Sequence, residues 1–263
     1  MALPFKVTTM FGLLRELGNL HDRPVVVGGA ANLVPLLVRE LAAGGDPSAV
    51  LTGAAHKEVE ALVYIIGDEV TEQDERALKA ARRSRVPTIV VAAGRDVPAR
   101  VPFVLATDVV RVAPGSGLDV DAVAAALGRR LGEEATSLAR RLPVLRRAVC
   151  AQLIDSFARK NAIIAGAIFI PGADLPALTL NQLRLVLRIC AAYGLDIDRQ
   201  RLPEVAATVG AGVGFREIAR SLVGAIPIAG WFAQGAMAYT GTRAIGEAAI
   251  RYCEARTKAA RAA

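Results

Sequence analysis

The chain has 263 residues, a net charge of +7 and 53% hydrophobic residues, but only 5% aromatic ones. That length accommodates one large domain or two ordinary ones. Its apolar content comes mainly from Ala, Val and Leu, together with 24 Gly, which favours close helix packing in a soluble bundle or in a membrane. Three separated cysteines without C-x-x-C spacing argue against a disulfide framework or a zinc site and indicate small buried side chains in a reducing compartment.

The excess of positive charge belongs to the second half of the chain. Met1–Arg130 holds 15 basic and 15 acidic residues, whereas the remainder holds 17 and 10. This asymmetry indicates an anionic partner, either lipid headgroups or nucleic acid, unless it is simply a solvated surface. The opening residues lack the basic and apolar regions of a secretory signal. We therefore expect the protein on the cytoplasmic side. We also expect residues 1–22 to form a short N-terminal helical segment.

The first half alternates apolar β-type runs with helical stretches. The runs are Arg23–Gly29, Glu60–Val70, Val86–Gly94 and Asp108–Gly115. Thr71 and Asp74 have nearly the spacing and chemistry of a capping box at the start of the helix between the second and third runs. Continuous apolar strands separated by helices predict a doubly wound parallel α/β domain over residues 23–132.

The second half has only helical periodicity, and it predicts an all-α domain over residues 136–256. We expect sharp helix breaks at Pro171, Gly172, Asp174, Pro227, Gly230 and Trp231. Proline cannot continue a helix, glycine relaxes a turn, and aspartate can cap the helix that follows. The uncharged stretch Ser221–Thr242 is long enough to cross a bilayer, while a re-entrant hairpin or turns in a soluble bundle also fit.

The carboxyl ends of the predicted strands are the expected ligand-binding edge of such a sheet. From Pro24 to about Leu131, the order of strands, loops and helices resembles the Era-like GTPase family. The resemblance implies remnants of a nucleotide pocket at Gly28, Gly29, Gly53, Asp96 and Ala113. In the same alignment the family's phosphate-binding lysine falls on Val34, and its magnesium-binding hydroxyl falls on Pro35.

These losses predict a domain without nucleotide chemistry, because nothing offsets the charge of a triphosphate or stabilises phosphoryl transfer. We expect no catalytic residue, no metal and no cofactor, with GTP and Mg²⁺ as ligands only if the pocket is functional after all. His21 and His56 have no cysteine or second histidine at metal-ligand spacing. A working GTPase with an unusual pocket, completed by a partner, is the alternative.

From about Ala139 to Glu254 the chain resembles a helical domain of unknown function, which occurs after Era-like GTPase domains and in YcjF-type inner-membrane proteins. The stretches that carry this resemblance include "IPGADLPALTLNQLRLVLRICAAYGLDI" and "AYTGTRAIGEAAIRYCE". The resemblance implies a membrane-associated or membrane-embedded helical module, coupled to a GTPase-type domain and without known catalytic activity.

Six basic residues precede the first apolar run of this second half: Arg140, Arg141, Arg146, Arg147, Arg159 and Lys160. Near an anionic leaflet such side chains attract the protein and keep that end of the chain cytoplasmic. We predict a non-catalytic adaptor with a pseudo-GTPase head, located on the cytoplasmic side of the cell membrane, which binds lipid and a protein partner or second copy. A soluble helical scaffold in the cytoplasm is the second alternative. Nucleic acid is disfavoured, because few aromatic residues lie among the basic ones.

Overall fold

The computed structural model describes residues 22–94, 100–113, 115, 117–167, 175–195 and 230–262. It divides into two compact units, of which the first ends at Gln152 and the second begins at Leu153. We call them the sheet unit and the helical unit and describe each by itself. The predicted corners Pro171, Gly172, Asp174 and Pro227, the pocket remnant Asp96 and nearly all of the segment 1–22 lie outside the described residues.

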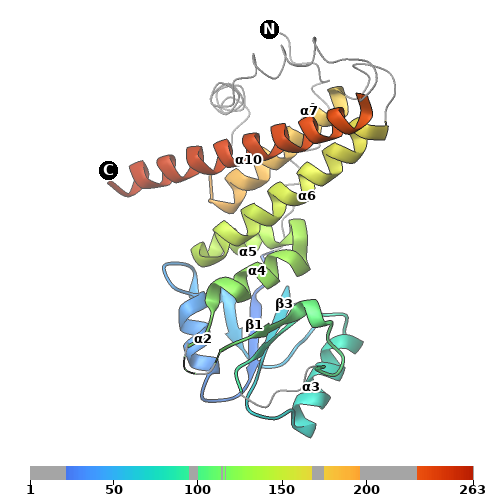
Figure 1. Cartoon of the computed structure of the whole chain (residues 1–263). Coiled ribbons are helices and arrows are strands. Elements are labelled where there is room, and N and C mark those ends of the chain that lie inside the picture. The colour runs from blue at the N-terminus through green and yellow to red at the C-terminus, as the bar shows by residue number, and fades with distance from the viewer. Residues whose placement is uncertain are drawn as a thin grey trace. The chain divides into compact units, whose positions relative to one another are not determined.

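The sheet unit is built on five parallel strands. They are β1 (Val25–Gly29), β2 (Val50–Thr52), β3 (Ala61–Ile66), β4 (Thr88–Ala92) and β5 (Val109–Arg111), in the spatial order β2-β1-β3-β4-β5 (Figure 1). The register pairs Val25 with Val50 and Ala61, and Val90 with Val109. The predicted parallel α/β architecture is therefore confirmed.

Helices cover both faces of this sheet. Helices α2 (Val34–Leu41) and α4 (Val120–Leu131) pack on one face, and α3 (Glu72–Arg83) packs on the other. All six residues of β3 are buried, as expected for a strand covered on both sides. On the α3 face the strand side chains form a core with Leu78 and Ala81 of that helix.

Helix α3 begins where its sequence predicts. Thr71 accepts a hydrogen bond from the Asp74 backbone N–H, and the Asp74 carboxylate accepts one from the Thr71 backbone N–H, which completes the capping box. The Tyr64 hydroxyl of β3 also donates to Asp74, at 2.9 Å. The cap therefore joins the start of α3 to the centre of the sheet.

Short elements connect and extend the sheet unit. They are the 3-10 turns η1 (Pro47–Ala49), η2 (Ala106–Asp108), η3 (Gly132–Glu134) and η4 (Pro143–Leu145), and the helix α5 (Ala135–Arg141). The side chains of Leu138, Leu142 and Leu145 are fully buried. The chain then enters helix α6 (Arg146–Ala167), which continues into the helical unit.

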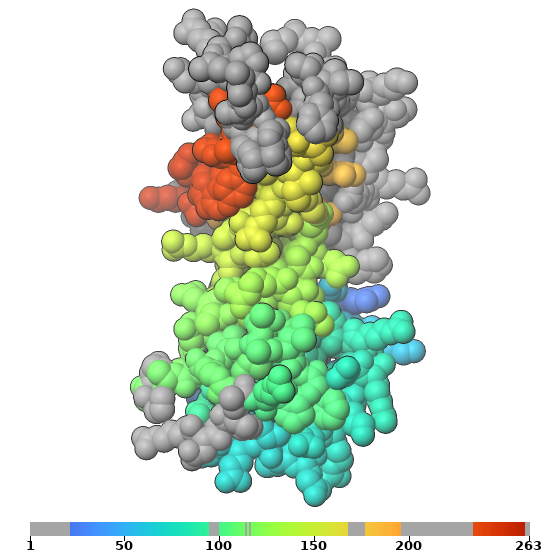
Figure 2. All heavy atoms as spheres, turned by 45° about the vertical axis from the view of Figure 1, so that its right-hand side comes forward, coloured from blue at the N-terminus to red at the C-terminus, as the bar shows by residue number. Residues whose placement is uncertain are grey.

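The helical unit contains the later turns of α6 together with α7 (Leu175–Ala192) and α10 (Gly230–Ala262). The buried Asn161 side chain of α6 joins all three helices: its amide donates to the Thr242 hydroxyl at 2.9 Å, and its carbonyl accepts from the Asn181 amide at 3.0 Å. In Figure 2 the red atoms of α10 lie directly against the yellow atoms of α6. The regular structure described after residue 136 is entirely helical, so the predicted helical second half is confirmed.

Two predictions about the helical unit concern residues of which the structure describes only a part. Gly230 is the first residue of α10, and Trp231 lies in its first turn, whereas most of the stretch Ser221–Thr242 lies outside the described residues. Among the helices that are described, none combines the length and apolarity needed to cross a membrane.

Candidate functional site

The carboxyl edge of the sheet, where the five strands end, is the expected ligand site of this architecture. The strand order reverses at β1, and ligands of doubly wound sheets bind beside such a switch point. Three of the predicted pocket remnants meet there, since Gly28 and Gly29 end β1 and Gly53 follows β2. Ala113 follows β5 at the same edge.

The missing side chain of Gly29 lets β1 pack closely against β3, and it does not make room for a ligand. Its φ is +103°, and a Cβ at this position would overlap the carbonyl oxygen of Ile65 in β3. The next residue, Ala30, donates its backbone N–H to that same oxygen at 2.9 Å. A side chain at residue 29 is therefore excluded both by the backbone conformation and by the neighbouring strand.

Two further glycines bring loops together along this edge. A Cβ on Gly28 would lie 2.6 Å from the carbonyl oxygen of Gly53, whose own N–H bonds to Val27 at 3.1 Å. A Cβ on Gly94, after β4, would overlap the backbone of Gly67 and Asp68 after β3. At Gly28, Gly29 and Gly94 the space on the Cβ side is therefore filled by neighbouring backbone, whereas it is open at Gly53 and Gly67 of the same edge.

The loop from β1 to α2 also offers little to a phosphate. The N–H groups of Leu33 and Val34 both donate to the carbonyl oxygen of Ala30, at 3.0 and 3.1 Å. The only cation between Gly28 and Leu41 is Arg39, in the last turn of α2, and it pairs with Glu40 at 3.2 Å. Among the described residues of the whole chain, no cluster of His, Cys, Asp and Glu is suited to a metal ion.

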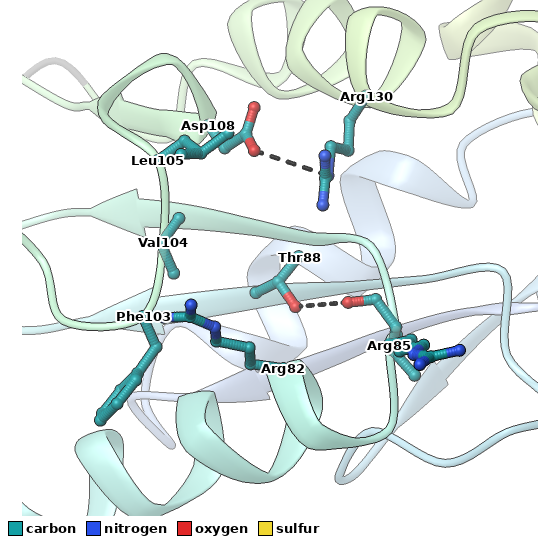
Figure 3. Close-up of a pocket in the computed structure, with 9 residues that line it drawn as sticks. Arg82, Arg85, Thr88, Phe103, Val104, Leu105, Asp108 and Arg130 are labelled. Atoms are coloured by element: carbon teal, nitrogen blue, oxygen red, sulfur yellow. Dashed lines mark hydrogen bonds and ion pairs between the residues drawn. The ribbon is translucent and has the colours of Figure 1, made fainter.

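The amino edge of the sheet, where the strands begin, carries a hollow of about 260 Å³ beside β4 and β5 (Figure 3). We call it the arginine hollow. It is lined by Arg82, Arg85, Val86, Thr88, Phe103, Val104, Leu105, Asp108 and Arg130. Arg130 reaches from the end of α4 toward Asp108, and Arg82 projects from the end of α3 on the other side of the hollow.

The hollow carries more positive than negative charge. The Arg130 guanidinium lies 3.5 Å from the buried carboxylate of Asp108. Within the part of the chain that the structure describes, Arg82 and Arg85 have no carboxylate within salt-bridge distance. Two exposed guanidinium groups beside one neutralised acid favour an anionic ligand, because arginine binds carboxylates and phosphates through paired donors.

The backbone around the hollow is unusual as well. Arg85 and Phe103, with φ of 57° and 66°, are the non-glycine residues with positive φ in the described chain, and both line the hollow. Phe103 and Leu105 are 37% and 63% exposed. Non-glycine residues in left-handed conformations and exposed large apolar side chains concentrate at binding sites.

Sequence reasoning missed this hollow. Arg82 and Arg130 come from α3 and α4, Arg85 and Val86 come from the connection between α3 and β4, and Phe103–Leu105 come from the segment before η2. The basic run "RRSR" at Arg82–Arg85 was interpretable only as charges that complement the dipole of α3. The apolar residues "FVL" at Phe103–Leu105 complete the hollow, but no spacing rule connects the two segments.

The basic residues predicted to face a membrane have varied surroundings. Arg140 and Arg147 are exposed. Arg146 donates to the carbonyl oxygens of Ala139 and Arg140, both at 3.2 Å. Arg141 bonds to the side chains of Asp46 and Ser48 and to the carbonyl oxygen of Asp22.

Two of these basic residues lie in the helical unit. The largely exposed Arg159 pairs with Asp155 at 2.8 Å, and the Lys160 ammonium lies 5.0 Å from the centre of the Phe157 ring. Ile163, one turn further along α6, is 71% exposed. This surface of α6 therefore combines cations with an exposed aliphatic side chain.

Comparison with known proteins identifies one matching family model, described as Domain of unknown function (DUF697), over residues 129–262. The match covers just over half of the chain and begins at Arg129 in the last turn of α4, one residue before Arg130 of the arginine hollow. No curated protein and no solved structure matches the chain.

Proposed function

We propose that this chain, which belongs to the DUF697 family, is a non-catalytic adaptor. In this proposal the sheet unit binds a protein partner, and the helical unit attaches to the cytoplasmic surface of a membrane. The observation that carries the proposal is the contrast between a carboxyl edge whose β1 loop holds no cation before Arg39 and the open arginine hollow at the opposite edge. Ligands of this architecture bind at the carboxyl edge, where a triphosphate needs a cation to offset its charge.

The sheet unit is, in our proposal, a GTPase-type domain that has lost its chemistry. Support comes from the order of its elements and from the position of the remnants: Gly28 and Gly29 end β1, Gly53 follows β2, and Ala113 follows β5. The residues that the family uses to hold phosphate and magnesium are Val34 and Pro35 here, and they begin α2 instead. Neither side chain can neutralise a phosphate or ligate a metal ion.

The partner that suits the arginine hollow is a protein segment with acidic and apolar side chains. Arg82 and Arg85 supply donors for carboxylates, while Phe103 and Leu105 supply apolar contact area. A volume of about 260 Å³ is smaller than the usual pocket for a whole cofactor, which is roughly 300–1,000 Å³. It is suited to one or two side chains of a larger molecule.

Membrane attachment is supported by α6. Arg159 and Lys160 lie about one turn before the exposed Ile163, so that cations and an aliphatic side chain share one stretch of helix surface. Each basic group near an anionic leaflet adds about 1 kcal/mol of attraction, which salt weakens. Apolar insertion by residues such as Ile163 is not weakened by salt in this way.

Washing of membranes tests the attachment. Membranes from cells that express the tagged chain are treated first with concentrated salt, then with alkaline carbonate, and finally with detergent. We expect the chain to stay with the membranes in salt and to be released by detergent. Recovery in the soluble fraction before any wash contradicts the membrane proposal, and complete release by salt reduces it to a purely electrostatic contact.

A turnover assay tests the absence of catalysis in the sheet unit. The full chain is incubated with GTP and Mg²⁺, with and without anionic vesicles, and released phosphate is followed. We expect no release above that from the buffer. Turnover that persists after further purification supports a working GTPase and contradicts the proposal, whatever the result of the membrane washes.

A further inference from the structure

The helical unit brings together two cysteines that are 63 residues apart in the sequence. The Sγ atoms of Cys190 in α7 and Cys253 in α10 lie 3.4 Å apart, and both side chains are fully buried. The third cysteine, Cys150, is equally buried but belongs to the sheet unit. The sequence indicated three separate apolar cysteines, and two of them are neighbours.

The contact between these cysteines lies in a well-defined register of α7 and α10. The Tyr193 hydroxyl, one turn after Cys190, donates to the carboxylate of Glu254 at 3.2 Å, and Glu254 directly follows Cys253. Two hydrogen bonds cap the end of α7 at this cysteine, because the N–H groups of Tyr193 and Leu195 both donate to the carbonyl oxygen of Cys190. The two thiols are therefore held beside each other by contacts other than their own.

We propose that Cys190 and Cys253 are a modification site at which a peroxide forms an intramolecular disulfide. A thiolate attacks hydrogen peroxide, which gives a sulfenic acid and releases hydroxide. The second thiolate then attacks that sulfur and expels a second hydroxide. In sum, two thiols and one hydrogen peroxide give one disulfide and two waters, and two electrons pass from sulfur to oxygen.

The buried position selects the oxidant and the product. Because both cysteines are fully buried, a small oxidant such as hydrogen peroxide, which is close to water in size, is favoured over a bulky disulfide reagent. Because each sulfur has the other within van der Waals distance, the sulfenic acid meets a thiol before it meets a second peroxide. The disulfide encloses residues 191–252 and fastens the end of α7 to α10. This inference does not depend on the proposed adaptor function.

The experiment is a time course of peroxide oxidation of the full chain under native conditions, stopped with catalase. The samples are then denatured in N-ethylmaleimide and measured by mass spectrometry. We expect two fewer labels than in the reduced protein and a mass about 2 Da lower before labelling, since two hydrogens are lost. Digestion should yield one cross-linked pair of peptides containing Cys190 and Cys253, which dithiothreitol separates.

Cys150 is the internal control because it is just as buried, and it should keep its label throughout the time course. The variant Cys190→Ala should form no cross-link, and Cys150→Ala should behave like the wild type. The disulfide should also raise the midpoint of thermal unfolding of the oxidised chain by roughly 10 °C, since it closes a long loop.

Three results overturn the inference. One is retention of both labels on Cys190 and Cys253 after oxidation of the folded chain. Another is loss of the Cys150 label at the same rate as the others. The last is a cross-link that joins two chains, seen as a dimer on a non-reducing gel.

Discussion

The two edges of the sheet are held together by different interactions. At the carboxyl edge Gly28, Gly29 and Gly94 let neighbouring backbones approach each other. At the amino edge charged side chains make the contacts, with Arg141 bound to Asp46 and Arg130 bound to Asp108. The backbone contacts at these three glycines do not depend on ionisation, whereas the contacts at the amino edge depend on charge and leave the arginine hollow open. In this chain the loop after β1 carries no cation before Arg39, and the exposed cations Arg82 and Arg85 lie at the opposite edge.

The largest expected effect comes from adding one methyl group to the carboxyl edge. In Gly29→Ala the new Cβ overlaps the carbonyl oxygen of Ile65 and the residue keeps a φ of +103°. We expect a loss of about 3 kcal/mol or more in the free energy of unfolding, since β1 and β3 must move apart. Urea unfolding followed by circular dichroism measures it.

Gly53→Ala is the matched control for this variant. Gly53 also has a positive φ, at 148°, but a Cβ there meets nothing within 4 Å. We expect only the conformational cost of about 1 kcal/mol. Equal losses in the two variants would show that strain alone, and not close approach of the strands, requires glycine at residue 29.

The next effect concerns the open part of the amino edge. Replacement of both hollow arginines, Arg82→Glu with Arg85→Glu, should weaken the binding of an acidic partner segment roughly tenfold or more. The probe is a fluorescein-labelled peptide of Glu and Leu residues, followed by fluorescence anisotropy. The same peptide with Gln in place of Glu should not bind.

A control with the same change in net charge separates the hollow from general basicity. In Arg39→Glu with Arg76→Glu, both replaced side chains are exposed and lie outside the hollow. This variant should bind the acidic peptide almost as the wild type does. Equal weakening in both double variants, or no binding to the wild type, would remove the hollow from the proposed function.

A smaller effect is expected at the ion pair of Asp46 and Arg141 on the amino edge, and it depends on pH. Hydrogen bonds from the Ser48 side chain and backbone, and then the Arg141 guanidinium, hold the pKa of the Asp46 carboxyl below its ordinary value of 3.8. Because the folded state lowers this pKa, its stabilisation is fully present above about pH 4 and is lost as the pH falls through the lowered value.

A double-mutant cycle of Asp46→Ala and Arg141→Ala measures this pair. The coupling between the two substitutions should be favourable near neutral pH and should vanish in acid, as measured by urea unfolding at both conditions. A coupling that stays constant down to about pH 2 would show that the carboxylate charge does not contribute.

Much of the sheet could be predicted because it depends on local sequence. Buried runs such as Ala61–Ile66 have the continuous apolar character of covered strands, and Thr71 with Asp74 identifies the start of α3. The apolar runs of the sequence predict four strands but not the short strand β2. It has three residues, two of them exposed, and so carries no run long enough to recognise.

The sites were harder to predict because they depend on contacts between distant residues. The sequence does not distinguish a glycine that makes room for a phosphate from one that makes room for a neighbouring strand. At Gly29 only the position of Ile65 in the structure decides between these roles. The arginine hollow and the pair Cys190–Cys253 likewise join segments that no spacing rule connects. A single sequence gives the identity of such residues but not which residues lie beside them in space.

Isothermal titration calorimetry of the full chain with GTP and with GDP, each in excess Mg²⁺, tests the central claim most directly. The missing lysine and the missing magnesium-binding hydroxyl predict no saturable heat for either nucleotide at concentrations up to about 1 mM, where even weak sites are detected. Saturable binding of either nucleotide with a micromolar Kd would contradict the account. Such a result would show that the carboxyl edge is accessible to ligands and that the chain is a nucleotide-binding protein.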